Sequence, residues 1–329
     1  MRHPARLLII LFLALAALVG PASAAAASVA PQAPPSPRIR GEPERGEAAR
    51  PRPDETPLIR SVSLSTRRPE QGRTVEVRVV LHRPATLSGE FRDQSLRFSQ
   101  NADGVWWALL AIGMPKAQAG VGLETPGGAY DVSITAASDD GETDTAERTL
   151  WVTGRSYTPI PFDPGPEKRH LLDIELRTAE ATRMWEMFAQ GTPDPLWQGM
   201  FWLPISAPSS GGFMVARSYP DGTTGFHEGL DYATAYGAPV RAAAHGVVAL
   251  AEPLGVRGNA IYIDHGAGVF SGYFHLSQIL VEPGQAVEPG QLIGRVGSTG
   301  LSTGPHLHFE IRVNGYNVSP WQWLTFEFP

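Results

Sequence analysis

Short runs of alternating apolar and polar residues recur through the chain from residue 58 onward, and they constrain its fold more than any other feature. A period of two is typical of a β-strand with one buried face. Between residues 58 and 155 this pattern occurs in segments 61–65, 75–80, 96–98 and 130–136. Gly- and Asp-rich turns separate the segments. Seven or so short strands at this spacing predict an immunoglobulin-like β-sandwich over residues 58–155.

Nothing in this predicted sandwich has catalytic spacing. Trp106 and Trp107 could form a platform for a ligand, but packing in the core is the favoured interpretation for two adjacent tryptophans on a strand. We therefore expect the domain to position the rest of the chain or to contact a partner protein.

Residues 156–196 are predicted to link this domain to the next. They begin Pro-rich and then contain a helical stretch at 167–190, with apolar residues near one face and a stop signal at 191–193. The stretch is too short and irregular to favour a coiled coil. We expect the helix to bridge the two domains.

The last segment, residues 197–329, is rich in Gly, Val and Pro and again predicts short strands, for example in 239–248 and 259–266. A small repeat at 281–286 and 287–292 carries a Pro-Gly turn signal in each copy. The repeat also resembles lipoyl or biotinyl carrier domains, but those require a modified Lys. Because residues 197–329 contain no Lys, the carrier interpretation fails.

Six of the nine histidines lie in the last third of the chain, in a pattern that suits a metal ion. His306, His308 and Glu310 have period two within an apolar run, so on a strand they share one face. His227 and Asp231 are four residues apart, where the flanking glycines favour a loop entering a strand over a helix. Two His and one Asp would bind Zn²⁺ and leave a fourth position for water. The two neighbouring imidazoles could share one ion, or one could bind it while the other faces the substrate.

Three motifs together resemble the LytM/lysostaphin-type zinc metallopeptidases. They are His227-x-x-x-Asp231, the Tyr-x-His-Leu-Ser segment at 273–277, and Gly-Leu-Ser-Thr-Gly-Pro-His-Leu-His at 300–308. The resemblance covers about residues 200–325. It implies a β-sheet peptidase domain of the duplicated hybrid motif type, with a groove across the sheet, and hydrolysis of peptide bonds in peptidoglycan cross-links.

The resemblance also implies residue roles. Carried over position by position, the zinc ligands are His227, Asp231 and His308, and the two catalytic histidines that do not bind the metal are His275 and His306. One of these two would transfer the proton to the leaving amine, while the other would stabilise the oxyanion. The residues themselves do not decide which has which role.

Five further residues near these motifs need an interpretation. Glu228 is not the base of a His-Glu-x-x-His zincin, because the second His of that motif is absent. Glu310 could orient a ligand ring, or it could be a surface carboxylate. His265 is interpreted as structural and His245 as a surface residue. Tyr219 is a weak candidate for a hydrogen bond to the oxyanion.

One departure from the family pattern lies just before the first ligand. The family often has Ser-x-Phe-Gly-x-Arg there, whereas residues 210–217 read Ser-Gly-Gly-Phe-Met-Val-Ala-Arg. The order differs, so we expect one groove wall to differ in shape from that of the family.

Other functional classes have less support. A non-catalytic scaffold that binds the wall or activates an amidase is the main alternative, but relatives of that kind typically lack one or more of the five site residues, and here all five are present. A lectin-like module has no supporting motif. A net charge of −6 and a pI near 5.9 argue against nucleic acid as a partner.

The N-terminus predicts export. Residues 1–24 have a basic start, an apolar run at 7–19 and a small-residue cleavage pattern at 22–24, as in a secretory signal. An uncleaved anchor is the alternative, although the run is shorter than the about 20 residues that span a bilayer. The chain has no Cys, which excludes disulfides and a lipoprotein anchor. Residues 25–57 are Pro-, Arg- and Glu-rich and predict a disordered or semi-extended spacer. We therefore expect a location in the periplasm, the cell envelope or outside a bacterium.

Overall fold

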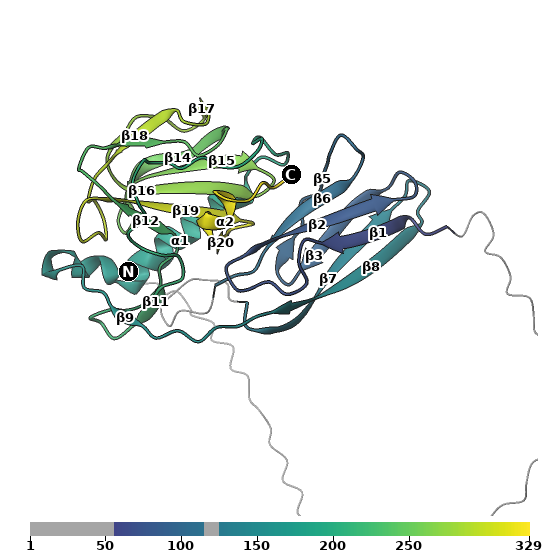
Figure 1. The fold of residues 1–329 in the computed structure, drawn as a ribbon, viewed down its shortest axis with the longest axis horizontal. Helices are drawn as coiled ribbons and strands as arrows, with labels where there is room; N and C mark the ends of the chain where they lie inside the picture. The colour runs from purple at the N-terminus through teal and green to yellow at the C-terminus, as the bar shows by residue number, and fades with distance from the viewer. Residues whose placement is uncertain (1–55, 115–124) are drawn as a thin grey trace, which may run out of the picture. The chain divides into compact units, whose positions relative to one another are not determined.

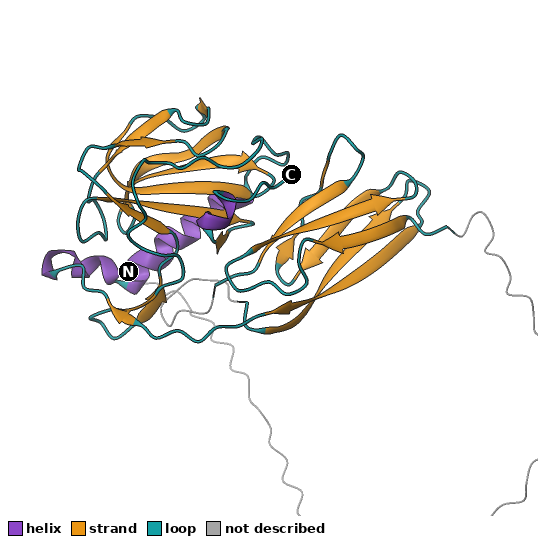
Figure 2. Cartoon of the chain, in the orientation of Figure 1, coloured by secondary structure: helices purple, strands orange, loops and turns teal. Residues whose placement is uncertain are grey.

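The structure is a computed structural model that describes residues 56–114 and 125–329. Strands far outnumber helices in these ranges (Figure 2), so the prediction of a mainly β chain is confirmed. The predicted signal at 1–24 and nearly all of the predicted spacer at 25–57 lie outside the described residues. Within the described ranges, no helix has both the length and the apolar character needed to span a membrane.

The first folded region consists of two four-stranded antiparallel sheets (Figure 1). One contains, in spatial order, β1 (Ile59–Leu64), β2 (Thr74–Leu81), β6 (Trp106–Ala111) and β5 (Ser99–Gln100). The other contains β4 (Gln94–Ser95), β3 (Thr86–Phe91), β7 (Gly128–Ala137) and β8 (Thr143–Val152). Their inner faces share one apolar cluster, which includes Val77, Phe91 and Ile134. This strand order is that of an immunoglobulin-like sandwich, as the alternation predicted.

One predicted strand is absent from this region. Residues 96–98 alternate in polarity, yet they lie between β4 in one sheet and β5 in the other. Here the chain crosses from sheet to sheet, with the amide of Leu96 bonded to the carbonyl of Gly89 at 2.8 Å. Burial of Leu96 at the crossing produces the same pattern as burial on a strand.

The predicted helix at 167–190 is divided into two pieces. A 3₁₀ segment, η2, covers Pro166–Leu172, and the α-helix, α1, covers only Ile174–Ala189. Asp173 separates the pieces because its side chain accepts a hydrogen bond from the amide of Leu176 at 3.0 Å, as a helix N-cap does. The buried residues Met184 and Phe188 of α1 pack against Tyr262 and Phe270 of the next region.

The second region is built on a nine-stranded sheet and a three-stranded one (Figure 1). The small sheet contains β9 (Ile160–Pro161), β10 (Ala216–Ser218) and β11 (Thr224–Phe226). The main path of the large sheet is β12 (Leu230–Ala233), β19 (His306–Val313), β16 (Val269–Ile279), β15 (Gly258–Gly266), β14 (Gly246–Leu254) and β17 (Ala286–Val287). The remaining elements are β13 (Pro239–Arg241), β18 (Leu292–Val296), β20 (Tyr316–Val318) and the short helix α2 (Pro320–Trp323).

The predicted Pro-Gly turns of the repeat are confirmed in this region. Gly284 and Gly290 both have positive φ, at 86° and 79°. In each turn the amide after the glycine bonds back to a glutamate carbonyl, Gln285 to Glu282 and Gln291 to Glu288. These are the φ values and the closing hydrogen bond that a type II turn requires.

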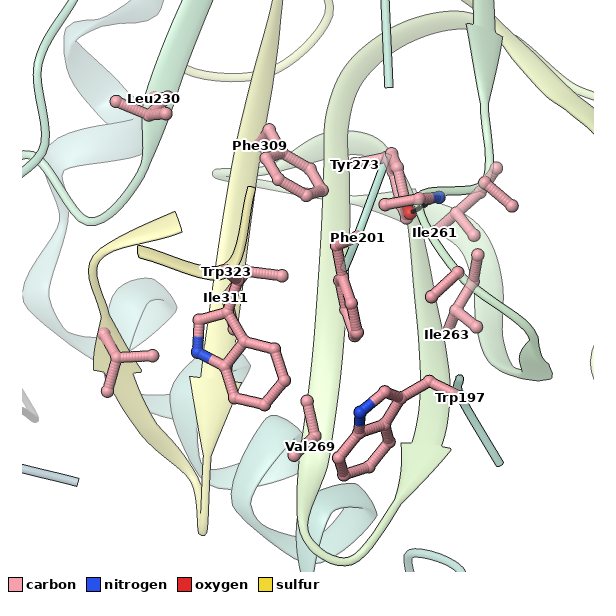
Figure 3. Close-up of a cluster of buried hydrophobic side chains, with 14 of the residues drawn as sticks. Trp197, Phe201, Leu230, Ile261, Ile263, Val269, Tyr273, Phe309, Ile311 and Trp323 are labelled. Atoms are coloured by element: carbon pink, nitrogen blue, oxygen red, sulfur yellow. Dashed lines mark hydrogen bonds between the residues drawn. The ribbon is translucent and has the colours of Figure 1, made fainter. Parts of the chain in front are cut away.

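One face of the large sheet is covered by an aromatic core (Figure 3). Phe309 and Ile311 of β19 contribute to it together with Trp197, Phe201 and Trp323. His306, His308 and Glu310 alternate with these residues on β19 and therefore face the other way. Trp107 of the sandwich joins the same core and lies edge-on to Trp197 at 6.0 Å, so core packing is its role, as predicted.

Candidate metal centre and catalytic site

Three side chains that lie far apart in the sequence converge at the edge of the large sheet. His227 Nε2, Asp231 Oδ1 and His308 Nδ1 lie within 4.8 Å of one another. Two of them are a cross-strand pair, because β12 runs antiparallel to β19 with Asp231 opposite His308. Directly opposite residues of neighbouring strands have adjacent side chains, which explains how this pair forms.

The third member, His227, lies in the tight connection between β11 and β12, as the glycines predicted. Gly229 makes this connection fit against β19. A Cβ at Gly229 would lie 2.3 Å from the carbonyl oxygen of Phe309 and 2.8 Å from Nε2 of His308. Any other residue there would push the loop away from the cluster.

The distances within the cluster show direct contact. Asp231 Oδ1 lies 2.9 Å from His227 Nε2 and 2.8 Å from His308 Nδ1, and the two imidazole nitrogens are 3.0 Å apart. The second nitrogen of each ring has its own acceptor. His227 Nδ1 lies 2.6 Å from the carbonyl oxygen of Gly212, and His308 Nε2 lies 3.3 Å from Glu310 Oε1. These outer partners fix each ring so that its remaining nitrogen faces the other two ligand atoms.

The pKa values of the three side chains follow from burial and from these contacts. Burial alone would raise the pKa of Asp231, but hydrogen bonds from His227 and His308 hold it well below its usual range. Burial alone would lower the pKa of His308, but its bonds to Asp231 and Glu310 raise that pKa to about 9. Burial also lowers the pKa of His227. Without a metal, His308 therefore carries a proton that a metal ion would displace on binding.

The donor set fits zinc. Two imidazole nitrogens and one carboxylate oxygen are ordinary zinc ligands, and three protein ligands are typical of a catalytic site. A tetrahedral ion with bonds of about 2.1 Å holds its ligand atoms about 3.4 Å apart, so the three atoms need to separate by only a few tenths of an ångström. The sequence left two interpretations of Glu310. Because its side chain is buried and contacts His308 Nε2, the contacts favour a residue that orients this ring over a surface carboxylate.

Two further histidines stand beside this cluster. The ring centroids of His275 and His306 are 4.8 Å apart, and that of His275 is 5.9 Å from His308. His275 Nδ1 lies 2.8 Å from the carbonyl oxygen of Thr299, and His306 Nδ1 lies 2.8 Å from that of Gly304. Since each Nδ1 donates to a carbonyl, each Nε2 remains an acceptor. Burial lowers the pKa of both rings, strongly for His275, so both are neutral at pH 7.

The backbone at His275 is unusual. Its φ is +61°, in the left-handed region that non-glycine residues rarely adopt. The register of β16 shifts against β15 between Tyr273 and Leu276, which marks a bulge that includes His275, and it shifts again against β18 just after that residue. Strain and bulges of this kind often re-aim a functional side chain.

Sequence comparison identifies the region that carries all five residues. The family described as peptidase family M23 matches residues 225–320. This stretch is an M23 peptidase domain. The resemblance to LytM and lysostaphin is therefore confirmed.

Several curated proteins share the M23 domain. Over 94 residues the chain is 51% identical to the DD-carboxypeptidase/endopeptidase Mpg of Neisseria meningitidis, covering 29% of this chain and 22% of that protein. Over 121 residues it is 41% identical to the peptidoglycan DD-endopeptidase ShyC of Vibrio cholerae, covering 36% and 27%. The chain thus spans about a quarter of the length of these relatives.

One solved structure is similar well beyond the M23 domain. A crystal structure of a Pseudomonas aeruginosa protein assigned to peptidase M23 has a TM-score of 0.58 and covers 78% of this chain and 95% of its own. The two are 24% identical, so the likeness concerns the fold.

Two hollows meet at the group of His227, Asp231, His275, His306 and His308, which we call the M23 cluster. An open cleft of about 320 Å³ reaches this cluster from one side and is lined by Asp231, His306, the loop 301–305 and Phe162. A smaller cavity of about 150 Å³ lies under α1, where Arg177, Met184 and Phe188 face His227 and His308. His275 and Arg217 line both hollows.

The other residues that the sequence singled out lie outside the cluster. His265 is buried and bonded to the carbonyl of His245 and to Ser271, a structural role as predicted. The His245 side chain itself is half-buried beside Glu288. Glu228 pairs with Arg312 rather than a histidine. Tyr219 lines the cavity under α1 and not the open cleft.

The altered loop at 210–217 proves to support the M23 cluster. Besides the carbonyl of Gly212, it supplies Arg217, whose Nη2 lies 3.5 Å from Asp231 Oδ2. Sequence analysis missed this carbonyl, because no side-chain pattern identifies a backbone acceptor. It also missed the contribution of the linker, where Phe162 lines the cleft and Lys168 bonds the carbonyls of Ser298 and Ser302.

Proposed function

We propose that the protein is an exported zinc metalloendopeptidase that hydrolyses peptide bonds in peptidoglycan cross-links. The observation that carries the proposal is the convergence of His227 Nε2, Asp231 Oδ1 and His308 Nδ1 beside two neutral histidines that open onto a cleft. The names of the M23 relatives, among them peptidoglycan DD-endopeptidases, support the substrate class. The basic and apolar start of the sequence supports export to the periplasm or cell envelope.

The three proposed ligands would contribute differently to binding the ion. His227 and His308 each offer one lone pair, and their other nitrogens are held by Gly212 and Glu310. Asp231 adds one negative charge, so a divalent ion bound here keeps a net positive charge. When bound, zinc would supply Lewis-acid chemistry that polarises a carbonyl and acidifies water.

The remaining steps belong to His275 and His306. Both rings line the cleft, and Nε2 of each is the nitrogen not bonded to a carbonyl, so either can accept the proton of the attacking water and pass it to the leaving amine. The other ring takes its own proton at Nε2 from bulk solvent and keeps it through the reaction, so that it can donate a hydrogen bond to the oxygen of the scissile carbonyl. Their carbonyl partners, Thr299 and Gly304, hold the rings in place while protons move at Nε2.

The test combines metal content with digestion of purified sacculi by the full-length protein. We expect about one zinc per chain and release of muropeptides, with cleavage abolished in His308→Ala. His245→Ala is the matched control, because that side chain lies outside the cluster. Zinc without cleavage by the wild-type protein would favour the scaffold that binds the wall or activates an amidase. A protein with neither zinc nor cleavage would refute the proposal.

The sandwich has no catalytic cluster among its described residues. We propose that it positions the M23 domain or contacts a protein of the envelope.

A further inference from the structure

The cavity under α1 contains more positive than negative charge. Four arginines line it, Arg177, Arg217, Arg257 and Arg312, but only two carboxylates, Glu228 and Glu310. Cavities of this kind attract anions, and their effect is strong where apolar walls exclude water. Met184, Trp185, Phe188, Phe226 and Phe274 supply the apolar part of the lining.

Two of these arginines are already paired with carboxylates. Arg257 Nη1 lies 2.6 Å from Glu180 Oε1, and Arg312 Nη2 lies 3.0 Å from Glu228 and 3.1 Å from Glu310. They hold the wall of the cavity together, since Glu180 comes from α1 and the others come from the M23 domain.

The other two arginines form no ion pair shorter than 3.5 Å with a residue that the structure describes. Arg177 forms no side-chain hydrogen bond or ion pair with any residue that the structure describes, and its Nη1 is shielded from solvent. Arg217 has only the long contact of 3.5 Å with Asp231, a carboxylate assigned to the metal. A buried guanidinium donor without a partner is rare in a folded protein and calls for an explanation.

Aromatic rings fix both guanidinium groups in place. Arg177 lies over the ring of Tyr219 at 5.4 Å, and Arg217 lies over the ring of Phe162 at 4.6 Å. The two rings in turn contact each other edge to face at 5.8 Å. A guanidinium that stacks on a ring keeps its N–H groups in the plane, free to bind a carboxylate. The four side chains come from α1, the linker, β10 and the residue that follows β10, so this is a tertiary arrangement.

We infer that Arg177, supported by Arg217, binds a carboxylate of the peptide substrate beside the metal centre. The inference rests on the proposed peptidase function and adds a specificity residue from α1, outside the M23 match at 225–320. A carboxylate is the anion that a peptide itself carries, at its C-terminus or on a side chain. The cavity shares His275, His308 and Arg217 with the open cleft, so a substrate in the cleft can extend a carboxylate toward Arg177.

The test compares two substrates. Cross-linked muropeptide dimers are used in native form and after conversion of their carboxylates to amides with carbodiimide and ammonia. Hydrogen bonds between charged groups contribute enough for the wild-type kcat/KM to fall by about 10- to 100-fold on amidation, mainly through KM. Arg177→Gln should lose a similar factor on the native dimer and little on the amide. Arg177→Lys should recover part of the loss.

Arg183→Gln is the matched control. Arg183 lies on the same helix, is 57% exposed and pairs with Glu252 away from the cavity. It should behave as wild type with both substrates. A similar loss of kcat/KM in Arg177→Gln and Arg183→Gln would mean that removal of any positive charge from α1 lowers activity. This result would overturn the inference.

Other outcomes are equally decisive. Equal cleavage of both substrates by the wild-type protein would overturn the inference and leave the proposed function intact, and so would a loss in Arg177→Gln that is the same for both substrates. Equilibrium binding of the two dimers to wild-type and Arg177→Gln protein is measured in parallel. If the wild-type protein cleaves neither dimer, the proposed function fails. Tighter binding of the native dimer that depends on Arg177 would then still support the carboxylate site, and equal binding would refute it.

Discussion

His265 and His308 are both buried in the nine-stranded sheet, yet their surroundings have opposite effects on charge. The ring nitrogens of His265 contact the carbonyl of His245 and the hydroxyl of Ser271, and burial lowers the pKa of this ring to about 4. His308 faces two carboxylates, and its pKa rises to about 9 despite burial. One imidazole is a neutral part of the core, while the other belongs to a charged site.

The difference follows from strand geometry. Both histidines have an acidic residue nearby in the sequence, Asp264 next to His265 and Glu310 two residues after His308. Adjacent residues of a strand point to opposite faces, whereas residues two apart share a face. The carboxylate of Asp264 accordingly binds Thr192 and the amide of Gly266, while that of Glu310 reaches His308. An acidic residue near a histidine on a strand therefore indicates a charged site only when the two are separated by two positions and share a face.

The largest effect should come from removing the charge at the centre of the cluster. In Asp231→Asn, the cluster loses the carboxylate that contacts both ligand histidines. Mutation of a residue that only supports a ligand typically lowers metal affinity by up to about 100-fold. Because Asp231 is itself a proposed ligand, we expect zinc affinity and cleavage to fall by more than this. The measurement is zinc competition with a chelator, together with sacculus digestion.

Asp264→Asn serves as the control for this prediction. It removes a buried acid beside a histidine in the same sheet but outside the cluster, so zinc affinity should stay at the wild-type value. Wild-type zinc affinity in Asp231→Asn would contradict the assignment of that residue as a ligand.

The next effect concerns pH and His265. Its pKa is about 4 in the folded protein, below the value of about 6.5 in an unfolded chain. The neutral form is favoured by folding, so this contribution is complete above pH 6.5 and is lost as the pH falls toward 4. The shift corresponds to roughly 3 kcal/mol of unfolding free energy. Urea unfolding at several pH values between 7.5 and 4 measures it.

Other buried histidines also titrate in this range, so the variant His265→Gln isolates the contribution of His265. Its unfolding free energy should fall less steeply with decreasing pH than that of the wild-type protein. Equal slopes would mean that His265 is not held neutral by burial, and the contrast with His308 would disappear.

The sequence was sufficient for the parts of the site that depend on local pattern. Period two placed His306, His308 and Glu310 on one strand face, and the glycines around His227 favoured a loop over a helix there. The sequence was insufficient where the structure depends on contacts or caps that have no periodic pattern. The alternation at 96–98 does not distinguish a strand from a crossing between sheets, and Asp173 divides a helix that otherwise has continuous helical character.

The same limit applies to the residues around the site. Arg177 and Phe162 border it only because α1 and β9 pack against the M23 domain, and their local sequence carries no sign of this contact. The bulge that gives His275 a φ of +61° also has no local signal, since neither Gly nor Asn stands there. The family resemblance assigned His275, while periodicity did not.

The smallest effect should come from Glu310→Gln, which tests whether the second carboxylate distinguishes His308 from His265. The amide keeps an acceptor for His308 Nε2 but removes the charge, so the pKa of His308 should fall and its ring should be less firmly held. Zinc affinity should decrease by about 10- to 100-fold. Glu228→Gln is the matched control, because Glu228 also pairs with Arg312 but contacts no ligand histidine. If both variants lose zinc affinity equally, Glu310 acts through Arg312 and the packing of the wall. If only Glu310→Gln loses it, a carboxylate two residues along the strand is what converts a buried histidine into a metal ligand.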